Sequence, residues 1–305
     1  MHVTNTNDRS ASAARTGLVF ALLGALGFSF KAILVKLAYR HGVDAETLLA
    51  LRMAFSLPFF AVMGVLAGRR ASTAMIPGDW LWMLGLGFFG YYLASYLDFL
   101  GLHYISAGLE RLILFLYPTI VIVLSALFFG KRITRRTVLA LCLCYLGIGF
   151  AVGHDLQVVG AARDVTVGSL LVFGSAVAYA LYLIGNGRVV ERLGSMRVTA
   201  FATSIACFLC IGQFLLLRPL DALIQPWQVY GLALAMALFS TVAPVWLVSE
   251  AIRRLGAGPV SMTGSLGPVL TIGLGWILLD ESIGPAQLAG AALVILGIAI
   301  VARRP

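Results

Sequence analysis

The chain has 305 residues, of which 60% are hydrophobic and only 11% are charged. Charged residues make up about a quarter of an ordinary soluble domain, so this composition excludes one. The formal net charge is +9, but the basic residues are scattered in short clusters between long apolar runs, whereas a nucleic-acid-binding domain gathers them on one face. We therefore expect a membrane protein that contacts lipid and no nucleic acid.

Ten apolar stretches are long enough to cross a membrane, because a helix needs about 20 apolar residues to span the hydrocarbon core. Helices are expected, since lipid cannot satisfy free backbone groups. The sequence therefore predicts an all-α integral membrane protein with ten transmembrane helices. Their expected residues are 16–37, 45–67, 79–101, 106–129, 137–153, 167–186, 198–217, 227–249, 258–279 and 285–301.

Lysine and arginine concentrate at one set of span ends, whereas the opposite ends hold Arg40, Arg163 and Arg218, with Lys36 nearby. Cytoplasmic loops of membrane proteins carry the excess of basic residues. We therefore expect a cytoplasmic tail at residues 1–15, a cytoplasmic C-terminus, and a multi-pass location in the inner or plasma membrane. The first apolar run lacks a convincing cleavage site, so it is expected to remain as a span.

One stretch of the chain occurs twice. Residues 102–149 align without a gap with the stretch that begins at residue 252, at a constant offset of 150 residues. The aligned pairs include Ala107 and Ala257, Pro118 and Pro268, Ile133 and Ile283, and Gly147 and Gly297. The chain therefore contains an internal repeat.

The two copies differ in the charge of one link. Residues 130–136 read GKRITRR, whereas residues 280–286 read DESIGPA. Five spans per copy is an odd number, so the second copy enters the membrane from the other side, and the basic link is cytoplasmic while the acidic link is external. This pattern predicts two inverted five-helix repeats, at residues 16–153 and 167–302, joined by an external linker at 154–166. Inverted repeats are typical of secondary transporters.

A family resemblance follows from these features. The ten spans and the A-x10-P-x14-I-x13-G pattern that closes each half resemble the drug/metabolite transporter superfamily, in particular its EamA-type members. The resemblance implies ATP-independent transport of small organic metabolites by alternating access, with export of amino-acid-like or amphiphilic solutes favoured. Two features depart from the family pattern. Lys131 replaces the usual acidic residue of the first link, and Glu110 and Arg111 occupy a segment that is usually apolar.

Five ionisable residues lie within the outer half of the predicted spans: Lys31, Arg52, Asp98, Glu110 and Arg111. A charge at the bilayer centre costs about 2.5 kcal/mol or more, so such residues usually face the bundle interior or water. Either the three cations neutralise the two acids and brace spans one to four, or part of this network contacts the substrate, with Lys31 and Glu110 as candidates, or binds a proton. The excess positive charge favours an anionic or carboxylate-bearing ligand.

Two further groups of residues are candidates. Tyr96, Tyr179 and Trp246 are predicted to line the cavity, because each lies inside a span expected to face it and carries a polar hydrogen; packing is the alternative. Pro118 and Pro268 lie in the middle of their spans, where proline removes a backbone hydrogen bond and kinks the helix. Their pairing by the repeat predicts two hinges, with a packing kink as the alternative.

The sequence shows no motif of an enzyme. The four histidines lie in the tail or in loops, no G-x4-G-K-[ST] motif occurs, and the four cysteines lie inside apolar runs, where packing is their expected role. We therefore expect no enzymatic activity, no cofactor and no metal. A lipid-carrier flippase, and an integral-membrane enzyme acting on lipid, remain alternatives. The oligomeric state is left open between a monomer and a homodimer.

Overall fold

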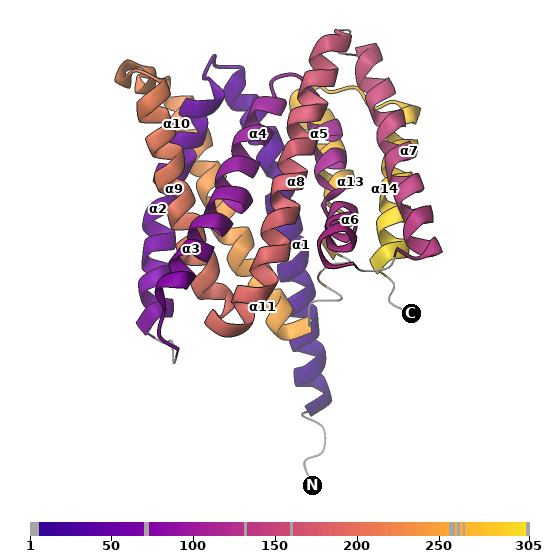
Figure 1. The fold of residues 1–305 in the computed structure, drawn as a ribbon. Coiled ribbons are helices and arrows are strands. Elements are labelled where there is room, and N and C mark those ends of the chain that lie inside the picture. Colours follow the sequence, from indigo (N-terminus) through magenta and orange to yellow (C-terminus); the bar gives the residue numbers. More distant parts are fainter. Residues whose placement is uncertain are drawn as a thin grey trace.

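The computed structural model describes residues 6–69, 73–130, 133–158, 161–255, 260, 263–264 and 266–302. Every regular element within these ranges is a helix (Figure 1). Eight helical stretches of this part of the chain are long and apolar enough to cross a membrane. The predicted spans at 258–279 and 285–301 correspond to two shorter apolar helices. Lys131, Arg132 and Ala257, which the repeat analysis used, lie outside the described residues.

The helices follow one another with short connections. π-helical segments (η1 and η3) interrupt two of the long helices, and η2 is a 3-10 turn. In chain order the elements are α1 (Thr6–Tyr39), α2 (Ala45–Arg69), α3 (Pro77–Leu86), η1 (Gly87–Leu93), α4 (Ala94–Gly101), α5 (Ala107–Leu114), α6 (Tyr117–Phe129), α7 (Arg135–Val158), α8 (Ala162–Leu193), α9 (Ser195–Leu217), η2 (Leu220–Leu223), α10 (Trp227–Ala237), η3 (Leu238–Val242), α11 (Ala243–Leu255), α13 (Gly267–Leu279) and α14 (Pro285–Ala302).

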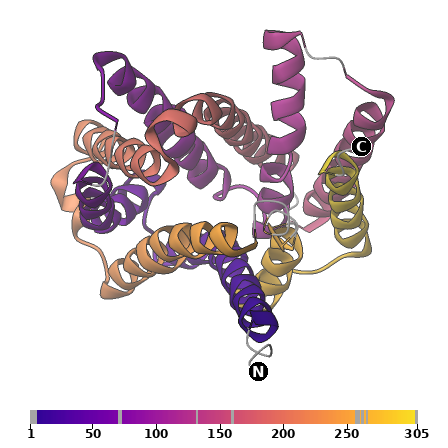
Figure 2. The same cartoon turned by 90° about the horizontal axis from the view of Figure 1, so that it is seen from below.

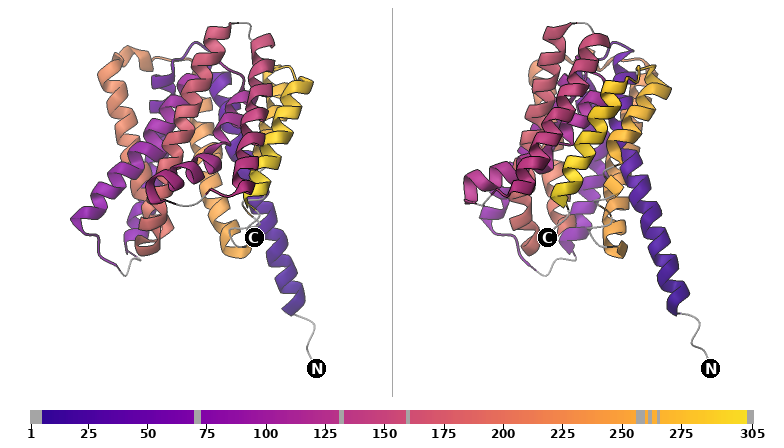
Figure 3. Two further views of the ribbon diagram at one scale, coloured as in Figure 1. Left: turned by 45° about the vertical axis from the view of Figure 1, so that its right-hand side comes forward. Right: turned by 90° about the vertical axis from the view of Figure 1, so that its right-hand side faces the viewer.

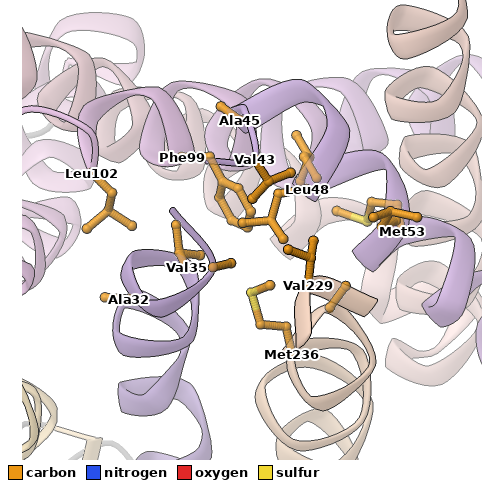
Figure 4. Packing of buried hydrophobic residues seen from close by; sticks show 14 of the residues in the cluster. Ala32, Val35, Val43, Ala45, Leu48, Met53, Phe99, Leu102, Val229 and Met236 are labelled. Atoms are coloured by element: carbon orange, nitrogen blue, oxygen red, sulfur yellow. The ribbon is translucent and has the colours of Figure 1, made fainter. Parts of the chain in front are cut away.

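The first helix connects the two halves of the chain. α1 packs against α10, α11 and α13 from the second half and against α5 from the first. Near the end of α1, the largest buried cluster joins it to α2, α4 and α10 through Val35, Leu48, Phe99 and Val229 (Figure 4). α1 begins and α14 ends at the same end of the bundle (Figure 1). We call the opposite end the far end.

The segment around Pro118 is broken rather than gently kinked. α5 ends at Leu114, and Leu116 has φ −72° and ψ −13° before α6 begins. α6 then leaves the direction of α5, runs out from the side of the bundle (Figure 2, Figure 3) and packs against α8. Leu266 has nearly the same dihedrals, φ −74° and ψ −14°, before α13. Both prolines therefore lie in the first turn of a helix, where proline is well tolerated.

The packing of α7 against α14 repeats at the offset of 150 residues. A Cβ added to Gly147 would lie 2.6 Å from the carbonyl oxygen of Gly290, and one added to Gly297 would lie 2.8 Å from that of Ala140. Adding 150 to Gly147 gives Gly297, and subtracting 150 from Gly290 gives Ala140, so the repeat converts the first contact into the second. Ala140 meets Gly297, whereas Gly147, later in α7, meets Gly290, earlier in α14, so the two helices are antiparallel.

The two π-helical segments also match at this offset. η3 at Leu238–Val242 corresponds to residues 88–92, which lie within η1. π-bulges within α-helices occur frequently at functional sites. η1 leads directly into α4, and η3 contacts α1 and α2.

We predict that Gly147→Leu disrupts the close approach of α7 and α14. The added side chain meets the Gly290 carbonyl and the Val294 side chain, and such overpacking costs roughly 1–3 kcal/mol. Gly149→Leu is the matched control, because no atom lies within 4 Å of a Cβ added there. Thermal unfolding of the detergent-purified proteins measures the difference. Equal unfolding temperatures for the two variants would contradict this account of the packing.

Candidate functional site

Three of the five predicted charged residues meet inside the bundle. Lys31 on α1 lies with its Nζ 2.6 Å from Asp98 Oδ2 on α4 and 3.3 Å from Glu110 Oε1 on α5. The Asp98 and Glu110 side chains are 2% and 0% exposed, and that of Lys31 is 17% exposed. We call these three residues the ion cluster. It joins three helices that are separate in sequence.

The carboxylates of the ion cluster keep unused hydrogen-bonding capacity. Lys31 donates to Asp98 Oδ2, whereas its contact with Glu110 Oε1 has the distance of an ion pair but not the geometry of a hydrogen bond. Among the described residues, neither oxygen of Glu110 nor Oδ1 of Asp98 has a hydrogen-bond partner. Buried polar groups are almost always hydrogen-bonded, so three partnerless carboxylate oxygens indicate a site for a ligand or a proton.

Arg52 lies apart from these contacts. Its buried guanidinium donates from Nε to Thr241 Oγ1 at 3.1 Å, and its Cζ lies 5.4 Å from the centre of the Phe99 ring. Thr241 in turn donates to the carbonyl oxygen of Met236. Arg52 therefore ties α2 to the π-helical segment η3. In the described part of the chain it forms no salt bridge.

Arg111 follows Glu110 in sequence but faces another neighbour. A Cβ added to Gly267 would lie 3.1 Å from Arg111 Nη2, so the guanidinium packs against the backbone at the start of α13. No salt bridge involves Arg111 within the described ranges, and its Nε has no hydrogen-bond partner there. At the ion cluster, therefore, one cation contacts two acids. The balance of three cations to two acids that the sequence suggested does not hold locally.

A row of tyrosine rings runs from α6 through α8 to η1. Tyr117 lies 5.2 Å from Tyr179, Tyr179 lies 5.5 Å from Tyr182, and Tyr182 lies 5.2 Å from Tyr91 with their hydroxyls 3.1 Å apart. Sequence reasoning selected Tyr179 but not Tyr117. The one available signal was its position directly before Pro118.

Tyr96 lies in a different polar group, at the far end of α2. Its hydroxyl donates to Glu46 Oε1 at 3.2 Å, and Arg218 reaches Glu46 Oε2 at 3.1 Å and Asp44 Oδ1 at 3.4 Å. Burial alone would raise the pKa of Asp44, but the hydrogen bonds from Thr47 and the charge of Arg218 outweigh it and hold that pKa below its ordinary value. This group joins α2 to the end of α9, and the structure does not bring Tyr96 to the ion cluster.

Trp246 and the surface grooves lie elsewhere. The Trp246 side chain is 58% exposed and its ring lies 5.7 Å from that of Phe20. Two apolar grooves of about 590 and 600 Å³ lie on α2, α3 and α9, lined by residues such as Phe60, Trp80 and Phe208. Neither groove includes a residue of the ion cluster. Their apolar linings suit contact with lipid.

A second network, not foreseen from the sequence, holds the N-terminal end of α5. Asp155 accepts hydrogen bonds from the backbone N–H and the hydroxyl of Ser106, at 2.8 and 2.7 Å. Glu281 Oε1 accepts from the Ala107 backbone N–H at 2.9 Å and lies 3.6 Å from Lys36 Nζ. Carboxylates stabilise the N-terminus of a helix by satisfying its free donors. They thereby position Glu110, one turn further along α5.

The chain matches a known family over nearly its whole length. Residues 15–153 and 166–303 match the EamA-like transporter family. The chain is similar to the uncharacterized transporter YcbK of Bacillus subtilis, at 30% identity over 91% of this chain and 89% of that protein. It is 26% identical to an uncharacterized transporter of Archaeoglobus fulgidus, over 91% and 95% of the two chains. These matches confirm the resemblance that the motif pattern indicated.

Two further comparisons concern a named exporter and a solved structure. The chain is 29% identical over 203 residues to the threonine/homoserine exporter RhtA of Escherichia coli K12, covering 66% of this chain and 64% of that one. A crystal structure that is 20% identical superposes with a TM-score of 0.60 over 96% of this chain and 99% of the other. At that identity the likeness concerns the fold alone.

We predict that Asp155→Asn destabilises the N-terminal end of α5 and lowers the unfolding temperature. The amide replaces one of the two acceptor oxygens by a donor, so one hydrogen bond to Ser106 is lost, at roughly 1–3 kcal/mol for a buried charged acceptor. Asp221→Asn is the control, because Asp221 lies exposed in η2. Thermal unfolding in detergent measures both variants. If Asp155→Asn unfolds at the temperature of the unchanged protein, Asp155 does not hold α5 in place.

Proposed function

We propose that this chain, which belongs to the EamA-like transporter family, exports small amino-acid-like or amphiphilic solutes without ATP hydrolysis. The chain is a membrane transporter, as its multiple apolar helices and its relatives indicate. The relative RhtA, named as an exporter of threonine and homoserine, favours amino-acid-like solutes and the outward direction. Relatives named as transporters also fit a protein without enzymatic activity.

The ion cluster is the observation that carries this proposal. Ionisable residues inside a membrane are costly and usually mark the path of a substrate or an ion. Here the cluster lies between α1, α4 and α5, and α1 also packs against the second-half helices α10, α11 and α13. Transporters with inverted repeats bind their substrates where the two halves meet. A polar solute bound here would contact groups whose hydrogen-bonding capacity is unused.

The proposed mechanism is alternating access by two inverted five-helix repeats, at residues 16–153 and 167–302. Three matches at the offset of 150 residues support it: the α7–α14 contacts, the π-helical segments and the breaks at Leu116 and Leu266. A fourth match is the residue that ends α6 and α13: Gly130 has φ 63° and Asp280 has φ 60°, so both are left-handed. A non-glycine residue in this left-handed region is uncommon. Exchanging the two halves' conformations would open the site to alternate sides.

The proposal includes an orientation and a location. With the cytoplasmic side at the end where α1 begins and α14 ends, the linker at 154–166 is external and the chain resides in the inner or plasma membrane. Pro118 and Pro268 then act as hinges. α6 diverges from α5, whereas α13 lies along the bundle (Figure 1), and this difference between the two copies supports the role.

A lipid-carrier flippase is the second candidate. The sideways course of α6 (Figure 3) and the apolar grooves on α2, α3 and α9 favour it, because an amphiphile needs a lateral route from the bilayer. The buried ion cluster favours a small polar solute instead. Counterflow of soluble metabolites, compared with scrambling of a labelled lipid carrier in the same liposomes, separates the two.

We predict that Glu110→Gln lowers the transport rate at least tenfold while the protein still folds. Metabolite profiling of cells with and without the protein selects the solutes, and counterflow in proteoliposomes, with threonine and homoserine included, measures their rates. Loss of a charged hydrogen-bond partner is worth about 1.5–3 kcal/mol, or roughly a tenfold to hundredfold lower rate. Glu250→Gln is the control, because Glu250 pairs with Arg253 and Arg254 at the opposite end of the bundle.

Two outcomes would contradict the proposal at different levels. If the purified protein moves none of the profiled solutes, the carrier function fails. If Glu110→Gln transports at the unchanged rate, the carrier function stands but the substrate does not bind at the ion cluster.

A further inference from the structure

Lys31 divides its charge unequally between two acids. Its Nζ lies 2.6 Å from Asp98 and donates a hydrogen bond to it, whereas the 3.3 Å contact with Glu110 is not a hydrogen bond. An ammonium has three donors, while two carboxylates offer about eight acceptor positions. Lys31 is therefore the partner of Asp98, and it leaves Glu110 without a hydrogen bond.

The other cations near Glu110 do not take its place. Arg111 packs against Gly267, and Arg52 donates to Thr241. The Glu110 side chain is nonetheless 0% exposed; its ion pair is the 3.3 Å contact with Lys31, and neither of its oxygens has a hydrogen-bond partner among the described residues. Two buried acids share one cation at this cluster, and an uncompensated buried charge costs several kcal/mol. The cluster is therefore short of one positive charge.

We propose that Glu110 binds a primary ammonium group of the transported solute, and that Lys31 controls this site by remaining on Asp98. Each acid then has one cation: Lys31 for Asp98 and the solute for Glu110. This inference rests on the proposed carrier function and narrows its substrates to amine-bearing solutes. It also reverses the preference for an anionic ligand that the total charge count suggested.

The arrangement makes Asp98 a positioning residue for a ligand that it does not bind. If Asp98 loses its charge, Lys31 is free to pair with Glu110, and the solute must compete with a tethered ammonium. A tethered group acts at millimolar effective concentration or above. Removing Lys31 as well leaves Glu110 alone with the same net charge as the original cluster.

The test measures amine binding to the detergent-purified full-length protein by isothermal titration at fixed pH and salt. The probes are butylammonium, its neutral analogue 1-butanol and the anion butyrate. We expect butylammonium alone to bind. Asp98→Asn is expected to weaken this binding about tenfold or more, and the double variant Asp98→Asn with Lys31→Met is expected to restore it to within about twofold, since both changes together conserve the local charge.

A structural role for the Lys31–Asp98 pair predicts the reverse order, because the double variant would be at least as impaired as the single one. The proposal is overturned if butyrate binds as well as butylammonium, or if Asp98→Asn binds as well as the original. It is also overturned if both variants fold and the double variant remains as weak as the single one.

A third variant covers the case in which these proteins do not fold. Lys31→Arg keeps the charge, and the planar guanidinium of arginine binds carboxylates with several donors at once. We expect it to engage both acids and to weaken butylammonium binding about tenfold. Arg253→Lys is the control, since Arg253 pairs with Glu250 in α11, away from the ion cluster. Unchanged binding by folded Lys31→Arg would overturn the proposal, whereas counterflow of an amine-free solute would leave the carrier function standing.

Discussion

The pairing of buried charge inside an apolar bundle is the constraint on which the rest of the structure depends. Lys31 and Asp98 neutralise each other across α1 and α4, and this contact also brings α1 to the start of α5 at Glu110. The position of Glu110 follows in turn from Asp155 and Glu281, which hold the first residues of α5. A residue of the second half, Glu281, thus helps to place a charge of the first half. The two halves are linked by electrostatics as well as by packing.

Close approach of helices supplies the remaining cohesion. In lipid, burial of apolar side chains gives little net gain between helices, so small residues that permit close packing matter more. Gly147, Gly290 and Gly297 serve this purpose between α7 and α14. Because the contacts repeat at the offset of 150 residues, α7 and α14 each place a glycine against the backbone carbonyl of the other helix at equivalent positions.

Inference from the sequence reached some of the site and not the rest. Lys31, Asp98 and Glu110 could be selected because charge is rare and costly in apolar spans. The direction of each side chain could not, since it depends on the rotation of its helix about the helix axis. Arg111 adjoins Glu110 in sequence but points toward Gly267, and Tyr96 pairs with Glu46 instead of facing the ion cluster.

The sequence by itself determined the helical, membrane-spanning character of the chain and its family, because apolar length, backbone hydrogen bonding and the repeat are properties of local segments. Only the tertiary structure decided which cation faces which acid. It also decided that the backbone turns at Leu116 and at Leu266, just before the two prolines, and that α6 runs out from the side of the bundle. The reason is physical: electrostatic energy and helix direction depend on distances between segments far apart in sequence, and a count of charges contains no distances.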